Sequence, residues 1–331
     1  MLGSLRKYKS QVSQTVRDFC HNIFHSKDAS IIVLRDINYQ GNNHFFRWIK
    51  KEYPNHYRKI KFGCPGYYQP SFSDCKLLVQ LLPDDYHLTH PRCYAKAAKN
   101  DEFCNRHGIP ITTPVVNLKS TGKCESSHLV NKAGVHMARI VRVTRDLAFD
   151  QVVDLVGNKF IIRDNFEHGQ DSYHLLVSDI SHYSSIDWNS LSDAIAIEFI
   201  DVKNEDGLYR KYRYLMIGDY GSTRSVMISK KWFTHESVIE RSNKLIEEEL
   251  KVLNLRENPF HLQFNKARKA LGLEYVGFDY GIDGNGELVI WEANAIPCVW
   301  PSFNVDSYFN YQLPAIYRFY EMMLKFYLEK T

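Results

Sequence analysis

Apolar residues along this chain follow a helical spacing at first and the shorter spacings of strands later. Over residues 4–24 they recur on one side of a helix, which predicts an amphipathic helix that packs against the body of the protein. The run at 31–34 is continuous and apolar, as in a buried parallel strand, and a helical pattern follows at 91–106. This alternation predicts a small α/β domain over residues 29–117.

From Leu118 onwards short strand patterns mix with helical ones, which predicts an α+β class. The predicted strands are 139–144, 159–163, 173–178, 194–200, 208–217, 222–229 and a hairpin at 274–294. The predicted helices are 123–133, 147–156, 236–254, 261–271 and 307–329. We therefore expect four parts, an N-terminal helix at 1–28, the α/β domain at 29–117, and two α+β subdomains at 118–195 and 196–331.

The hairpin at 274–294 carries the most informative polar residues. With Asn285-Gly286 as a two-residue turn, Asp279 lies opposite Glu292, and Asn294 points to the same face as Glu292. Opposed carboxylates repel each other across a sheet, and a hard cation such as Mg²⁺ would offset that repulsion. The alternative is a hairpin whose charges face water. The other face is expected to pack in the core and carries Val276, Phe278, Tyr280, Ile282, Val289 and Trp291.

Composition excludes several classes of protein. Lys and Arg number 42 against 38 Asp and Glu, and a net charge of +4 is too small for a nucleic-acid binder that relies on a basic tail. No apolar run approaches the roughly 18–20 residues that a membrane span needs. The polar start does not resemble a secretory signal, and the 7 cysteines form no close pairs. We therefore expect a cytoplasmic protein without a nucleic-acid or membrane partner; the sequence contains no indication of its oligomeric state.

Asp279, followed by Glu292 and Asn294 in the segment 291–297, resembles the metal-binding end of the ATP-grasp superfamily. In that superfamily an Asp on one strand is followed by Glu-x-Asn on the next strand and then by a Pro. Glutathione synthetases, D-alanine–D-alanine ligases and glutamate-adding ligases share this pattern. The resemblance extends over about residues 115–300. It implies an ATP-grasp fold of two α+β subdomains, preceded by a small α/β pre-ATP-grasp domain, with ATP and Mg²⁺ bound between the subdomains.

The resemblance also implies residues that hold the phosphates of ATP. Lys123 stands where the family places its first phosphate-binding basic residue, and Arg163 ends the strand that carries the second. An arginine offers phosphate a fixed fork of donors, although a lone Arg at a strand end is more often a surface residue. His168 lies in the loop that corresponds to the family's phosphate-covering flap.

Further residues follow from their order along the chain. Glu198, Phe199 and Ile200 are similar to the hinge that binds adenine, with Asp201 near the ribose. The segment 206–213 resembles an Asp-Gly-x-Tyr-Arg-Lys-x-Arg motif of an uncharacterised ATP-grasp branch. Strand alternation places its Lys211 and Arg213 on one face, where a basic pair would bind phosphate or a substrate carboxylate. The alternative is an exposed strand kept soluble by basic residues.

The function that the resemblance implies is that of an ADP-forming, Mg²⁺-dependent ligase. It would activate a small-molecule or peptide carboxylate as an acyl phosphate and join it to an amine, with Arg163 and Arg213 stabilising the transferred charge. Two alternatives stay open at this point. One is an ATP-grasp kinase that phosphorylates a hydroxyl, and the other is a nucleotide-binding protein without turnover.

Overall fold

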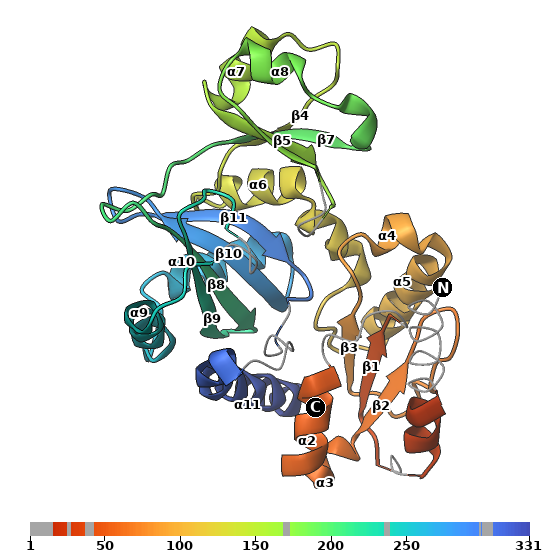
Figure 1. Ribbon diagram of the computed structural model, residues 1–331. Coiled ribbons are helices and arrows are strands. Elements are labelled where there is room, and N and C mark those ends of the chain that lie inside the picture. Colours follow the sequence, from red (N-terminus) through yellow and green to blue (C-terminus); the bar gives the residue numbers. More distant parts are fainter. Residues whose placement is uncertain are drawn as a thin grey trace, which may run out of the picture.

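The first part of the chain forms a parallel three-stranded sheet flanked by helices (Figure 1). The computed structural model describes residues 16–24, 28–36, 43–167, 173–234, 239–297, 299 and 307–331. Strand β1 (Ile31–Arg35) lies between β2 and β3 and is buried throughout, which explains its unbroken apolar run. The other elements are β2 (Ile60–Gly63), β3 (Leu77–Leu81), α2 (Asn43–Glu52), α3 (Pro54–Tyr57), α4 (Tyr86–Thr89) and α5 (Pro91–Arg106).

A second sheet, the small sheet, is antiparallel and has four short strands in the order β4-β7-β5-β6. It stands apart from the other sheets at the top of Figure 1. Helices α7 and α8 pack on it through Val152 and Tyr183, which contact Phe160 of β5 in a local core. The elements are η1 (Val115–Thr121), α6 (Lys123–Lys132), β4 (Ile140–Arg142), α7 (Phe149–Val156), β5 (Phe160–Asp164), β6 (His174–Val177), α8 (Ile180–Ser184), η2 (Trp188–Ser190) and β7 (Ala194–Glu198).

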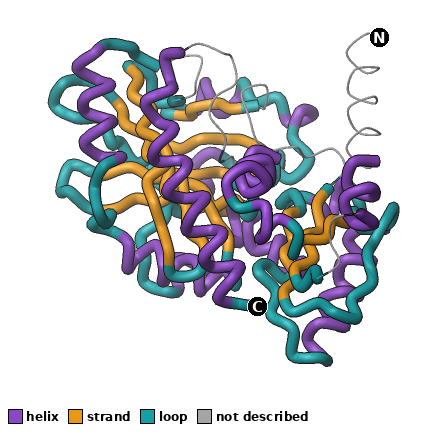
Figure 2. Tube along the Cα trace, turned by 90° about the horizontal axis from the view of Figure 1, so that it is seen from below, coloured by secondary structure: helices purple, strands orange, loops and turns teal. Residues whose placement is uncertain are grey.

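The third sheet is the larger antiparallel one, with strand order β11-β10-β8-β9. Its core with α6 and α10 includes Val130, Phe264 and Phe278. Figure 2 shows α11 running across the sheet, and a separate core joins α11 to both this sheet and the first domain. The elements are β8 (Tyr209–Ile217), β9 (Tyr220–Ser229), α9 (Asn243–Leu253), α10 (His261–Leu271), β10 (Tyr275–Ile282), β11 (Leu288–Asn294), η4 (Ser307–Gln312) and α11 (Leu313–Glu329).

The turn of the β10–β11 hairpin differs from the predicted one. Gly286 donates its N–H to the carbonyl of Asp283 at 3.0 Å, so the turn spans 283–286. Gly286 has φ +83°, whereas Asn285 does not have a positive φ, so the pair is not the two-residue turn expected from Asn-Gly. The longer turn shifts the pairing near the tip by one residue, and Ile282 lies opposite Leu288.

A β-bulge after Asp279 restores the predicted pairing further along the hairpin. Tyr280 pairs with Ile290, but Asp279 pairs with Glu292, so Trp291 is the extra residue of the bulge. A Cβ on Gly281 would lie 2.4 Å from the Trp291 ring, so only glycine fits beneath this side chain. The prediction that Trp291 packs in the core is wrong, because the bulge turns it towards a cleft.

Some of the other predicted helices and strands have the expected bounds and others do not. Helix α5 has the predicted bounds, 91–106, whereas α9 begins at Asn243, where Ser242 caps it by accepting the N–H of Leu245 at 3.3 Å. The four-residue strand β2 was not predicted. Residues 16–24 are helical, but they pack through polar side chains rather than through the expected apolar stripe.

His168, the predicted flap residue, lies outside the described residues. No described helix is long and apolar enough to cross a membrane.

Candidate active site

A cleft lies between the small sheet and the larger β8–β11 sheet. It contains about 870 Å³ of atom-free space, part of it open solvent. Its walls are divided by chemistry. The apolar and aromatic side chains are Ile161, Ile197, Phe199, Ile200, Trp232, Phe233 and Trp291. The charged side chains are Lys123, Arg163, Glu198, Lys211, Asp279 and Glu292.

Lys123 is the first residue of α6, and its side chain is almost fully buried. Its Nζ donates to the carbonyls of Asn165 at 3.1 Å and Glu167 at 3.0 Å, and lies 3.2 Å from a carboxylate oxygen of Glu292. Burial lowers the pKa of the Lys123 ammonium and nearby Arg163 lowers it further, while Glu292 opposes both effects. A buried cation at the cleft is therefore held by two carbonyls and one carboxylate.

Arg163 projects into the same cleft from β5. Its Nη2 donates to the Glu167 carbonyl at 2.8 Å, whereas its buried Nε has no hydrogen-bond partner among the described residues. Burial lowers the pKa of the guanidinium, and the carboxylates of Glu292, Glu167 and Asp164 partly offset this. An unpaired buried donor beside a second cation favours an anionic ligand, because an anion would satisfy the donor and relieve the repulsion.

The predicted carboxylate pair is present on the opposite wall of the cleft. Asp279 and Glu292 are cross-strand partners, and Arg213 binds both Asp279 oxygens, Nε to Oδ1 at 2.6 Å and Nη2 to Oδ2 at 2.8 Å. Lys211 Nζ lies 3.6 Å from Asp279 Oδ2. Burial by itself would raise the pKa of Asp279, but Arg213 and Lys211 hold it below its usual value. The solvated-hairpin alternative therefore does not describe Asp279, which is 3% exposed.

Asn294 is less closely associated with this group. It pairs with Gly277, two residues from Glu292 on the same face of β11, and it does not line the cleft. The next residue, Ala295, donates its N–H at 2.8 Å to Asp84, which comes from the first domain. The structure thus brings Asp279 and Glu292 together and places Asn294 beside them.

The predicted hinge residues Glu198, Phe199 and Ile200 all line the cleft. Glu198 is bound by Arg139 through Nε and Nη2, both at 3.1 Å, which counters burial and lowers the pKa of Glu198. The Phe199 ring lies under Lys159 at 4.1 Å. The N–H of Ile200 has no acceptor among the described residues, so it can donate to a ligand. Asp201 is exposed and accepts from the N–H of Lys203 at 3.0 Å, outside the residues that line the cleft.

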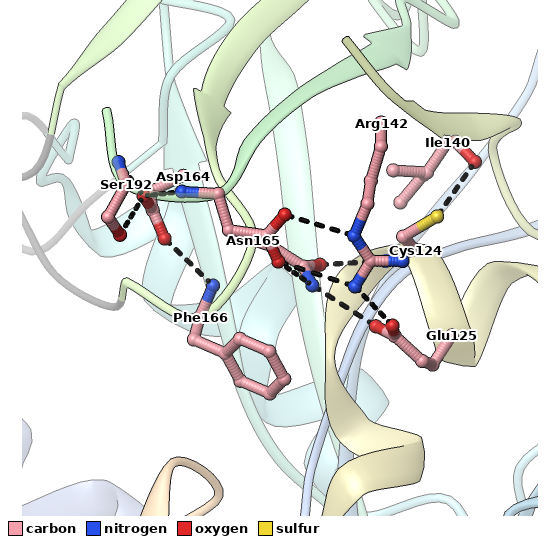
Figure 3. Close-up of polar contacts among 9 residues, drawn as sticks. Cys124, Glu125, Ile140, Arg142, Asp164, Asn165, Phe166 and Ser192 are labelled. Carbon is pink, nitrogen blue, oxygen red and sulfur yellow. Dashed lines mark hydrogen bonds and ion pairs between the residues drawn. The ribbon is translucent and has the colours of Figure 1, made fainter. Parts of the chain in front are cut away.

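Sequence reasoning did not identify the cluster that holds Lys123 and the residues after β5 in place (Figure 3). Asn165 is fully buried, and its Nδ2 donates to Glu125 at 3.1 Å and to Asp193 at 2.9 Å. Its Oδ1 accepts from the Cys124 N–H at 2.9 Å. Arg142 binds both Glu125 and Asp193 and completes the cluster. No local pattern marks Asn165, because its partners come from two distant segments of the chain, the start of α6 and Asp193 before β7.

Asp164 belongs to the same cluster but faces away from the cleft. Its Oδ2 accepts from the N–H and hydroxyl of Ser192 at 2.8 and 2.7 Å and from the N–H of Asp193 at 2.9 Å. Burial would raise the pKa of Asp164, and these donors lower it. A Cβ on Gly122 would lie 2.8 Å from the Phe166 ring, so the segment 164–166 packs directly on the start of α6. This packing holds the Asn165 carbonyl, one of the two that accept from Lys123, in its place.

No protein-family model matches the chain, and no curated protein matches it. Solved structures do resemble it. N5-carboxyaminoimidazole synthetase from Staphylococcus aureus, complexed with ADP, has a TM-score of 0.55 at 11% identity over 88% of this chain and 79% of that one. The ATP-grasp ligase PsnB, complexed with a minimal precursor, Mg and ADP, has a TM-score of 0.54 at 12% identity, over 89% and 98%. D-alanine–D-alanine ligase from Bacillus anthracis has 0.51 at 14%, over 90% and 99%.

Proposed function

The chain has the α+β ATP-grasp fold, and from this premise we propose that it is an ATP- and Mg²⁺-dependent ligase. It would activate a carboxylate as an acyl phosphate and join it to an amine of a small molecule or peptide, with release of ADP. The fold alone does not imply an activity, so the proposal depends on the residues of the cleft.

The observation that carries the proposal is that one cleft is lined both by apolar and aromatic side chains and by a cluster of buried charged ones. Phe199, Ile200 and Trp291 offer flat or apolar surfaces to a nucleobase. Lys123 and Arg163 lie close to each other, and Lys123 forms an ion pair with Glu292, the cross-strand partner of Asp279. A nucleoside triphosphate combines the same two kinds of chemistry, an aromatic base and charged phosphates.

The residues fit both ATP and a hard cation. The unpaired Nε of Arg163 and the Ile200 N–H are donors for phosphate and base edge, respectively. Asp279, Glu292 and Asn294 offer only oxygen ligands in this proposal, which suit Mg²⁺. When bound, the metal ion would neutralise phosphate charge and align the γ-phosphoryl group. We further propose that Lys211, which lines the cleft, contacts the phosphates, and that Asp201, next to the cleft residue Val202, contacts the ribose.

In the proposed reaction, a carboxylate oxygen of the substrate attacks the γ-phosphorus of ATP. The bond from that phosphorus to the bridging oxygen breaks, and its electrons leave with ADP. Lys123, Arg163 and Arg213 stabilise the charge that spreads over the phosphoryl oxygens. The amine nitrogen then attacks the acyl carbon, inorganic phosphate departs with the bonding electrons, and the amine proton passes to water. Only this ligase outcome couples ADP release to a new amide, whereas a kinase would leave a phosphorylated hydroxyl.

A comparison of thermal shifts tests the proposal. Glu292→Gln removes one charge and keeps the shape of the side chain. In the protein alone, relief of the repulsion from Asp279 and loss of the ion pair with Lys123 act in opposite directions, so each Mg·ATP shift is taken relative to the variant's own melting temperature. With Mg·ATP, the variant should lose most of the ligand-induced rise in melting temperature that wild type shows. Glu287→Gln, at the exposed tip of the same hairpin, is the matched control and should behave as wild type. Equal Mg·ATP shifts in all three proteins would contradict the proposal.

A further inference from the structure

The helix at residues 16–24 is attached to the first domain by its polar side. Asp18 forms an ion pair with Arg35 of β1 at 2.5 Å. His21 Nε2 lies 2.8 Å from the Ile60 carbonyl, and Asn22 donates to the Phe62 carbonyl at 2.8 Å, both on β2. A surface helix of a globular protein usually has the opposite orientation, with apolar residues inward.

The apolar side of this helix faces outward. Val16, Phe19, Ile23 and Phe24 are 54%, 47%, 51% and 67% exposed. Their spacing places them along one stripe of the helix. Tyr67 extends the exposed surface at 65%, next to Tyr68, whose ring contacts Phe19 at 5.6 Å. Contiguous exposed apolar residues of this kind mark an interaction site more often than single ones do.

The net positive charge of the protein lies in its N-terminal residues, which include this helix. Residues 1–27 contain five Lys or Arg and one Asp, a net charge of +4, and the whole chain has a net charge of +4. The other residues therefore balance to zero. A basic segment that also presents a row of aromatic and aliphatic side chains has the two properties that an anionic lipid surface attracts.

We propose that the outward stripe, defined by Val16, Phe19, Ile23 and Phe24, binds an anionic lipid surface with the helix lying in its plane. A second copy of the chain is a poorer occupant. Two copies would bring the net positive charges of residues 1–27 together. The nine described helical residues, about 13 Å long, present far less than the roughly 800 Å² per partner of a stable interface. This proposal is independent of the ligase proposal and revises our sequence-based expectation of no membrane partner.

Co-sedimentation of the full chain with vesicles tests the proposal. Phosphatidylcholine vesicles and phosphatidylcholine–phosphatidylserine vesicles are compared, each at low and high salt. Wild type should sediment with the anionic vesicles only, and less so at high salt. Ile23→Ser/Phe24→Ser should weaken that binding by about tenfold or more, because two inserting side chains are lost without a change of charge. Leu262→Ser, at a 77% exposed leucine of α10, is the matched control and should bind as wild type.

Thermal unfolding of the double variant, monitored by circular dichroism, should match wild type, since both side chains are more than half exposed. The proposal is overturned if wild type binds neither vesicle, or if the double variant binds as well as wild type. It is also overturned if analytical ultracentrifugation shows a wild-type dimer that the double variant does not form, because a second copy would then cover the stripe.

Discussion

Two buried aspartates, Asp279 in the wall of the cleft and Asp164 facing away from it, have different partners and therefore different roles. Asp164 and Asp279 are 2% and 3% exposed, and both have a pKa below the usual value although burial alone would raise it. The donors to Asp164 are mainly backbone N–H groups and one hydroxyl within its own subdomain. The donors to Asp279 are the side chains of Arg213 and Lys211.

This difference in partners has a physical consequence. Backbone N–H groups cannot leave Asp164 without unfolding the local structure, so that carboxylate is a fixed part of the fold. Arg213 and Lys211 are partly exposed side-chain cations, which a rotamer change can move, and we expect them to exchange Asp279 for a phosphate while a metal ion takes their place. We therefore interpret Asp164 as structural and Asp279 as functional.

The largest expected effect is on stability and separates the two aspartates. Asp164→Ala leaves three backbone N–H groups without this acceptor, each costing about 1–3 kcal/mol, so the free energy of unfolding should fall by at least about 3 kcal/mol. Asp279→Ala should cost less, because the side chains of Lys211 and Arg213 are 20% and 23% exposed and water can solvate them. Urea unfolding of both variants measures this. An equal or larger loss for Asp279→Ala would contradict our interpretation.

The second prediction concerns the affinity for ATP and the side chain of Arg163. If the unpaired Nε of Arg163 serves a phosphate, Arg163→Ala should weaken ATP binding by about 1.5–3 kcal/mol, the scale of a charge-assisted hydrogen bond. The fold should stay intact, because Arg163 gives up only the bond to the Glu167 carbonyl. Calorimetric titration with Mg·ATP measures the affinity, with Arg145→Ala, an exposed arginine of the same subdomain, as the control. Unchanged affinity for Mg·ATP would contradict a role for Arg163 in phosphate binding.

The smallest expected effect is on the pH dependence of stability. The folded-state pKa of each aspartate lies below the unfolded value of 3.8, so each contributes stability that is present above that pH and lost as the pH falls through the folded-state pKa. Asp164→Asn and Asp279→Asn should therefore each flatten the acid side of the stability profile, below about pH 4. Urea midpoints measured across this range test the prediction, and an unaltered acid limb in both variants would contradict it.

Much of the site followed from local rules of sequence. Strand alternation and one turn signal placed Asp279 opposite Glu292, although two errors cancelled, since the turn is longer than expected and a bulge restores the register. The turn of Trp291 towards the cleft could not be predicted, because no local sequence pattern marks the bulge. Asn165 depends on partners in α6 and in the segment before β7, which only the folded chain brings together. The outward stripe at 16–24 has the helical spacing that the sequence predicts, but spacing does not say which side faces the protein.

The most direct test of the account measures metal binding without nucleotide. If Arg213 holds the Asp279 carboxylate that a metal ion would take, removal of the guanidinium frees both oxygens and removes a positive charge. Calorimetric titration with Mg²⁺ alone should then show Arg213→Ala binding at least about tenfold more tightly than wild type, a difference of about 1.4 kcal/mol. Arg210→Ala loses the same charge from the same strand, but Arg210 pairs with Asp206 and Glu248 instead, so this variant should match wild type. Equal Mg²⁺ affinity in Arg213→Ala and Arg210→Ala would contradict the exchange of partners at Asp279.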